Sequence, residues 1–237
     1  MIEAEGEPYL FDCGPGVLEA MEELGFNFRS LYKIFLTHFH PDHTLGLGRL
    51  LAAINNDPAS ADRERLIVHG PRGLKDFFER WNTLYSSTRP DRDYLELDEV
   101  GPGDVTREGL IRIRAAEAQH GDMPALAYRI EEESTSIVYT GDSEYSESLI
   151  EFSSGAGILV AECSFPDERP VPGHMTPADV GRLASEARAE QVLLVHMYPE
   201  VDGTDPARSV KKRYKGRVTV ARDGMVLDLG VDESGQK

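Results

Sequence analysis

The sequence lacks the features that mark disulfide-bonded, secreted or membrane-spanning proteins. Its 237 residues include only two cysteines, Cys13 and Cys163, which lie far apart, so reduced thiols are expected rather than a disulfide framework. No apolar run approaches the roughly 20 residues of a membrane span, and the N-terminus lacks the basic and then apolar stretch of a signal peptide. We therefore expect no membrane partner and a cytoplasmic location.

Basic residues are also scarce. Lysine and arginine number 25 against 42 aspartates and glutamates, which gives a formal net charge of -17. Such a surface repels polyanions, so a long nucleic acid would need a local basic groove, whereas a small phosphodiester is not excluded. The basic cluster from Arg208 to Arg217 is interpreted as the solvated face of a late helix, with a phosphate-contacting patch as the alternative.

Apolar stretches of strand length alternate with longer segments of helical period. Strands are expected over residues 8–12, 33–37, 65–70, 110–118, 125–131, 136–142, 157–162, 191–197, 217–221 and 225–229. Helices are expected over residues 16–24, 43–55, 73–85, 145–152, 177–189 and 206–214, and Thr176, Pro177 and Asp179 supply start signals for the fifth. Residues 81–108 are polar and turn-rich, and they are expected to form a surface connection, or else an arm over a site. This pattern predicts sheets covered by helices in an α/β or α+β layered domain.

Three histidines and one aspartate are packed into the stretch FLTHFHPDH. His38, His40, Asp42 and His43 follow an apolar, strand-like run, and Pro41 breaks regular structure and suits the start of the next helix. These residues are therefore expected on a strand-to-helix loop, where their side chains can converge. Histidine and aspartate are donors for zinc, manganese or iron, so the spacing predicts a metal site.

Three more metal-competent residues stand where predicted strands give way to loops. They are His120, Asp142 and His196. Open α/β sheets place functional groups at such positions. Taken singly, each of them has an ordinary structural interpretation. Together with the histidine-rich loop they supply seven ligands, enough for two ions.

The order H-x-H-x-D-H, a distant H, G-D and a last H resembles the metallo-β-lactamase-fold hydrolases, from Tyr9 to Leu229. Within that superfamily the sequence is most similar to ribonuclease Z and its phosphodiesterase and arylsulfatase relatives, on the blocks LFDCGPG, THFHPDHTLGL, YTGDS, AECSF and GHMTPADVGRLA. The resemblance implies a four-layer αββα sandwich forming one domain over residues 1–230, with residues 231–237 as a disordered tail. It also implies a dinuclear metal-dependent hydrolase, specifically a phosphodiesterase that uses a metal-bridging hydroxide.

Carried over residue by residue, the resemblance implies two divalent metal ions. The first would be held by His38, His40 and His120, the second by Asp42, His43 and His196, with Asp142 bridging them. Zinc is the expected metal, and manganese or iron are the alternatives. Asp42 would also orient the hydroxide. A histidine rather than a glutamate at position 40 argues against oxygen-reducing di-iron relatives, and an aspartate rather than a cysteine at the second site argues against true β-lactamases.

His174 resembles the family histidine that contacts the scissile phosphate and helps to protonate the leaving oxygen. Glu162 is expected to hold His174 in one tautomer, although a surface acid at a strand end is the alternative. His69 has no ligand match and is interpreted as structural. Trp81, Tyr85 and Tyr198 are interpreted as core packing residues rather than pocket-lining ones.

Two departures from the family bear on the substrate. Only 21 residues separate His120 from Asp142, which leaves no room for the long arm that grips tRNA in ribonuclease Z enzymes. We therefore expect a small phosphodiester or another ester, with an arylsulfatase, a lactonase or another ester hydrolase as the alternative and a non-catalytic metal-stabilised binding protein as a third. The block that starts at Tyr9 also comes early, so either the true start lies upstream or the first sheet is reduced. A reduced sheet would expose an edge and favour a homodimer.

Overall fold

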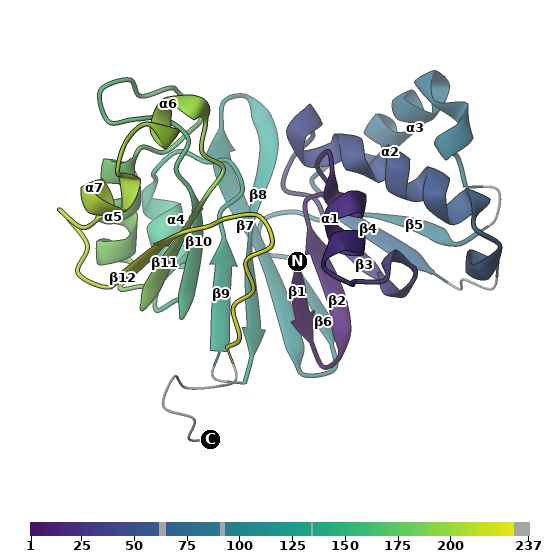
Figure 1. Ribbon diagram of the computed structural model, residues 1–237, viewed down its shortest axis with the longest axis horizontal. Coiled ribbons are helices and arrows are strands. Elements are labelled where there is room, and N and C mark those ends of the chain that lie inside the picture. The colour runs from purple at the N-terminus through teal and green to yellow at the C-terminus, as the bar shows by residue number, and fades with distance from the viewer. Residues whose placement is uncertain (62–64, 91–92, 134, 230–237) are drawn as a thin grey trace.

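The chain is arranged as helices, sheet, sheet and helices in a computed structural model that describes residues 1–61, 65–90, 93–133 and 135–229 (Figure 1). The predicted αββα sandwich is therefore confirmed. The expectation of a single domain over residues 1–230 stays a prediction, although the two sheets share one apolar core, which supports it. The predicted disordered tail lies outside the described residues.

The first sheet has the order β1-β2-β3-β4-β5. Its strands are β1 (Ile2–Ala4), β2 (Glu7–Phe11), β3 (Lys33–Phe35), β4 (Leu66–Gly70) and β5 (Leu95–Glu99). Only β1 is antiparallel to its neighbour, and the other pairs are parallel. All residues of β3 and β4 are buried, as expected for parallel strands covered on both faces.

The second sheet has the order β12-β11-β10-β9-β8-β7-β6. Its strands are β6 (Val105–Glu108), β7 (Ile111–His120), β8 (Met123–Glu132), β9 (Thr135–Tyr139), β10 (Ile158–Glu162), β11 (Gln191–Val195) and β12 (Arg217–Val220). Strands β9 to β12 are parallel, whereas β6 to β9 pair in antiparallel fashion. In β8, Leu126 and Tyr128 face the first sheet while Ala125 and Ala127 face the helices, so one strand serves two cores.

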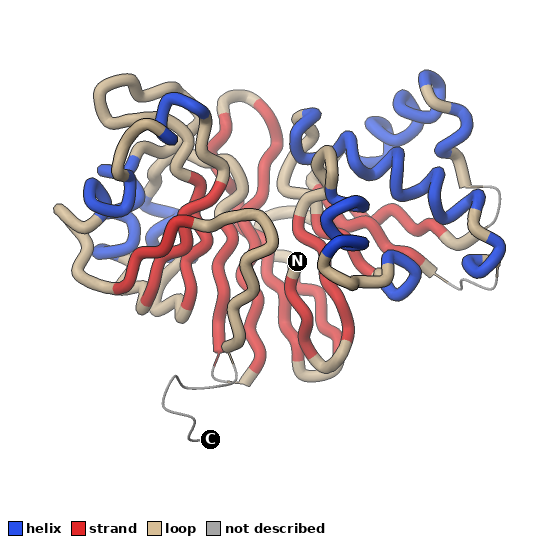
Figure 2. Tube along the Cα trace, viewed as in Figure 1, coloured by secondary structure: helices blue, strands red, loops and turns tan. Residues whose placement is uncertain are grey.

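Helices cover the outer face of each sheet, so the strands lie in the middle of the molecule (Figure 2). The first sheet is covered by α1 (Val17–Glu23), α2 (Pro41–Asn56) and α3 (Leu74–Leu84), and the second by α4 (Glu147–Phe152), α5 (Pro177–Glu186) and α7 (Pro206–Val210). The short helix α6 (Pro199–Asp202) follows β11. The predicted start of α5 is confirmed, because Thr176 and Asp179 form a capping box and Pro177 occupies the first turn. Within the described residues, no helix is both long and apolar enough to cross a membrane.

Several predicted elements differ from the structure at the edges of the sheets. The strand expected over residues 225–229 is wrong, because these residues form no strand and all five of them are more than a third exposed. Conversely, β1 was not expected, and the polar segment 81–108 contains β5 and β6 rather than a plain connection. Both of these strands are only half-buried and contain acidic residues, which are uncommon in strands, so their sequences do not indicate strands.

Candidate metal centre

The predicted site residues lie at one edge of the sandwich, beyond the carboxyl ends of strands. Strands β2 to β5 run in one direction, and so do β7 and β9 to β12, so their carboxyl ends gather at this edge. The loop after β3 and the first turn of α2 carry four of the predicted residues, and the remainder end or follow β7, β9, β10 and β11: His38, His40, Asp42 and His43, then His120, Asp142, Glu162, His174 and His196. All of them are brought to one place.

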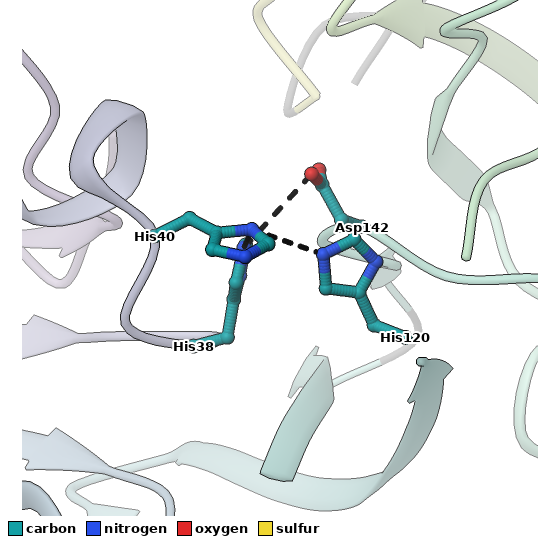
Figure 3. A group of neighbouring side chains, drawn as sticks. All are labelled: His38, His40, His120 and Asp142. Carbon is teal, nitrogen blue, oxygen red and sulfur yellow. Dashed lines mark hydrogen bonds and ion pairs between the residues drawn. The ribbon is translucent and has the colours of Figure 1, made fainter. Parts of the chain in front are cut away.

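The first group of ligand atoms comes from His38, His40, His120 and Asp142. His38 Nε2 and His120 Nε2 each lie 3.0 Å from His40 Nδ1, and Asp142 Oδ2 lies 3.9 Å from His38 Nε2. The four side chains point at one another from the two halves of the molecule (Figure 3).

Hydrogen bonds on the far side of two imidazoles assign their tautomers. The Thr37 hydroxyl donates to Asp12, so it accepts from His38 Nδ1 at 3.0 Å. His120 Nδ1 donates to the Gly173 carbonyl at 2.7 Å. Each ring therefore turns an unprotonated Nε2 toward His40, so the lone pairs of the two Nε2 atoms are directed at the same point. A cation satisfies such an arrangement, because neither nitrogen has a proton to give the other.

The second group comes from Asp42, His43, Asp142 and His196. His43 Nε2 lies 3.3 Å from His196 Nε2 and 3.4 Å from Asp142 Oδ1. Asp42 Oδ2 lies 3.1 Å from His196 Nε2 and 3.6 Å from His43 Nε2. Asp42 is half exposed, so this group opens toward solvent while the first is enclosed.

The same logic fixes the tautomers in the second group. His43 Nδ1 donates to Asp12 Oδ2 at 2.7 Å. His196 Nδ1 donates to the Ser164 hydroxyl at 2.9 Å, and that hydroxyl donates in turn to Glu162. In the neutral rings both Nε2 atoms are unprotonated, and they face the carboxylates. Carboxylate and hydroxyl partners of this kind are typical of metal-binding histidines.

Asp142 links the two groups. Its Oδ2 faces the first group, and its Oδ1 faces the second at 3.4 and 3.5 Å from His43 and His196. The Oδ1 atom is buried and has no hydrogen-bond partner within the described residues. A buried carboxylate oxygen without a donor is costly unless a cation accompanies it, so the residues present fit bound metal. The cluster is thus able to hold metal ions.

Asp12 was not among the predicted site residues, yet it organises both groups. It accepts hydrogen bonds from the Thr37 amide and hydroxyl, from His43 Nδ1 and from the Tyr139 hydroxyl. Asp12 and His196 are also non-glycine residues in the left-handed region, with φ of 56° and 52°. The signal for Asp12 was the block LFDCGPG, and those for Thr37 and Ser164 were the blocks THFHPDHTLGL and AECSF.

Glycine is required where Asp142 is placed. Gly141 has a φ of 55°, and a Cβ there would lie 2.7 Å from the Thr37 side chain. The G-D pair of the sequence therefore brings the Asp142 backbone against the loop after β3.

Charges within the cluster shift the pKa values in opposite directions. Burial lowers the pKa of His43, but its hydrogen bond with Asp12 and the nearby carboxylate of Asp142 prevail and raise it to about 10. Burial and the positive charge of His43 lower the pKa of His38 to about 3. Burial would raise the pKa of Asp142, yet the nearby imidazole of His43 holds it well below its usual range. The proton on His43 occupies the place of a cation, and metal binding would release it.

His174 lies beside the two groups of ligand atoms and faces Glu162. Its Nδ1 is 3.2 Å from both Glu162 oxygens and 3.8 Å from Asp142 Oδ2. Burial lowers the pKa of His174, but the bond to Glu162 outweighs this and raises it. Glu162 is buried and also accepts from the Ser143 amide, so the interpretation of Glu162 as a surface acid is wrong.

The sequence analysis also singled out four residues that belong to neither ligand group: His69, Trp81, Tyr85 and Tyr198. His69 is buried, its Nδ1 donates to the Asp98 carboxylate at 2.9 Å and its ring stacks on Phe35, which agrees with its structural interpretation. Tyr85 and Tyr198 are 51% and 38% exposed, and Trp81 is half-buried, so none of these three belongs to the core. Their interpretation as core packing residues is wrong. Trp81 lies on α3, Tyr85 directly follows this helix, and Tyr198 lies on the segment after β11.

Comparison with known proteins agrees with this geometry. A family model described as "Beta-lactamase superfamily domain" matches residues 8–197. Ribonuclease Z of Methanosarcina acetivorans is 28% identical, and the alignment covers 97% of this chain and 91% of that protein. The probable metallo-hydrolase YhfI of Bacillus subtilis is 29% identical, with 92% and 87% covered.

Solved structures show the same fold. The crystal structure of the metallo-β-lactamase-fold protein YhfI from Bacillus subtilis has a TM-score of 0.79 at 27% identity, and it covers 94% of this chain and 88% of that one. The short form of human tRNase Z has a TM-score of 0.76 at 24% identity, with 96% and 90% covered. The predicted resemblance is thus confirmed in sequence and in fold.

Proposed function

The chain belongs to the β-lactamase superfamily, and we propose on that premise that it is a metal-dependent phosphodiesterase of the ribonuclease Z-like type. The observation that carries the proposal is the position of His174. A histidine with a raised pKa, held by a buried carboxylate, stands next to Asp142, the carboxylate that both ligand groups share. A proton donor at that place suits a reaction whose leaving group is a poor alkoxide.

The ligand sets support two divalent ions, with zinc as the proposed metal. The first ion would be held by His38, His40 and His120. The second would be held by Asp42, His43 and His196, and Asp142 would contact both ions. Mixed imidazole and carboxylate donors are typical of zinc sites. When bound, the ions would lower the pKa of a coordinated water and neutralise charge on the phosphoryl oxygens.

The protein residues around the ions have separate tasks. Asp42 is the half-exposed carboxylate of the second group, so it can accept a hydrogen bond from the attacking water and orient it. His174 donates a proton to the leaving oxygen. Glu162 fixes the His174 ring and, through Ser164, that of His196 as well. One buried carboxylate therefore aligns a ligand and the proton donor together.

The proposed substrate is a small phosphodiester. Strands β8 and β9 occupy the stretch between His120 and Asp142, so the described residues there contain no inserted arm. The net charge of -17 also disfavours long polyanions. The homodimer and the cytoplasmic location stay predictions.

The test is hydrolysis of bis(p-nitrophenyl) phosphate by the purified protein loaded with zinc or manganese, beside a His174→Ala variant. We expect turnover with metal and a large loss in the variant. Absence of diester turnover with every metal tried would overturn the proposal. A wide preference for an aryl sulfate or a lactone would instead favour those ester classes, and bound metal without any hydrolysis would favour a binding protein.

A further inference from the structure

Two aromatic residues, Phe165 and Tyr198, lie beside the metal centre and belong to neither group of ligands. Phe165 follows Ser164 on the loop after β10, and Tyr198 directly precedes α6, the helix labelled in Figure 1. Their rings stack, with centroids 4.8 Å apart and planes 16° apart. The Tyr198 amide donates to the Ser164 carbonyl at 3.2 Å, which ties the two segments together. We call Phe165 and Tyr198 the aromatic wall.

The aromatic wall contacts the site on the side of the proton donor. The Phe165 centroid lies 5.3 Å from that of His174, with planes at 67°. Tyr198 meets His174 at 6.2 Å and His196 at 5.6 Å, both with planes at 75°. Edge-to-face contacts of this kind fix the rings relative to the two histidines. The wall therefore borders the place where the leaving group would receive its proton.

The wall also has an accessible and uncharged surface. Tyr198 is 38% exposed, although it stacks on Phe165. A tyrosine phenol is uncharged at neutral pH, so the wall does not repel an uncharged ring. An apolar ring that is held rigidly and left partly open can take a second ring at little entropic cost.

We propose that the aromatic wall is the leaving-group subsite, and that the leaving group of the substrate contains a planar aromatic ring, as a nucleoside or an aryl alcohol does. This inference rests on the proposed phosphodiesterase function and adds the chemical class of the leaving group. A well-oriented aromatic pair should lower the dissociation constant about two- to twelvefold relative to a saturated ring of matched size.

The test uses the zinc-loaded protein and two ligands that cannot be cleaved, benzylphosphonate and cyclohexylmethylphosphonate. A methylene replaces the leaving oxygen in both, and the rings differ only in being planar and aromatic or saturated. Isothermal titration calorimetry gives the two dissociation constants. We expect benzylphosphonate to bind about two- to twelvefold more tightly, and we expect Tyr198→Leu to remove that preference while Tyr198→Phe keeps it.

The matched control is Tyr85→Leu, which changes an exposed tyrosine on the segment after α3 and should leave both constants unchanged. Unchanged zinc content and Tm show that each variant is folded. Equal binding of the two phosphonates by the unaltered protein, or a preference that survives in Tyr198→Leu, would overturn the subsite alone. If neither phosphonate binds, the subsite is wrong, and the separate assay of diester turnover decides whether the proposed phosphodiesterase function stands.

Discussion

Exchange of Asp12 for asparagine tests whether hydrogen bonds behind the histidines decide which nitrogen faces the metal. Asp12 accepts from four donors, and His43 Nδ1 is one of them. An amide has the same shape but offers one acceptor oxygen and an NH₂ group. If the NH₂ group faces His43, it donates to Nδ1 and moves the ring proton to Nε2, the atom that is turned toward Asp142.

The structure sets the magnitude of this effect. In that orientation the carbonyl oxygen accepts the two hydrogen bonds from Thr37, and the Tyr139 hydroxyl is the buried donor that loses its acceptor. Such a loss costs about 1–3 kcal/mol, so the free energy of unfolding should fall by about that amount. Loss of a hydrogen-bonding partner behind a metal ligand lowers metal affinity by about 10–100-fold. The second group should show this effect because His43 belongs to it, while the first depends on Asp12 only through Thr37.

Two measurements separate these effects. Removal of metal by chelators of graded strength, followed by metal analysis, gives the affinity of each group, and urea denaturation in excess chelator gives the fold's own stability. Tyr139→Phe is the matched control, since it removes one donor to Asp12 and leaves His43 bound; it should cost about 1 kcal/mol and keep both ions. Wild-type affinity at the second group in Asp12→Asn would refute the tautomer argument.

The other predictions concern the proton donor, the metal-free cluster and the thiols. His174→Ala should lower diester hydrolysis about a hundred- to ten-thousandfold with unchanged metal content; metal lost together with the rate would make His174 a ligand instead. Because the contact with Glu162 outweighs burial and raises the pKa of His174, kcat should fall as the pH rises through that pKa, and Glu162→Gln should move the fall to lower pH in a pH-rate profile. In metal-free protein, the raised pKa of His43, about 10 against 6.5 when unfolded, stabilises the fold fully below pH 6.5 and is lost as the pH rises through 10. Urea midpoints between these pH values should therefore decrease, and a His43→Gln variant that keeps the same slope would contradict this account. Burial raises the pKa of the Cys163 thiol to about 12, so iodoacetamide should label it at pH 8 in urea and not in the native protein. Fast labelling of native protein would show that the C-terminal half opens.

The sequence predicts the buried strands of the fold well and its edges poorly. Apolar runs such as 33–37 and 191–197 mark β3 and β11, because strands covered on both faces need apolar residues throughout. Strand β6 has the sequence VTRE and is half-buried, so its pairing with β7 depends on a neighbour that a local pattern does not reveal. Residues 225–229 show the converse, since an apolar run without a pairing partner forms no strand.

The metal-competent residues were predictable for a different reason. Parallel strands bring the histidines and aspartates at their carboxyl ends together at one edge of the sheet. The residue type and its position at a strand end are therefore enough to predict these ligands. The residues behind them were not predictable in this way. Asp12, Thr37 and Ser164 are common residues whose role depends on hydrogen bonds across the two halves of the molecule, and no spacing in the chain encodes those contacts.

The left-handed backbone at Asp12 and His196 sets a limit on how this protein can be engineered for heat resistance. A non-glycine residue in that region costs roughly 1–3 kcal/mol, and glycine would relieve it. Both positions, however, carry side chains that the metal centre uses. Substitutions chosen for thermal tolerance alone would therefore select glycine or asparagine there and erase the chemistry. A screen for robust variants should hold these two positions fixed and search the helices of the outer layers instead.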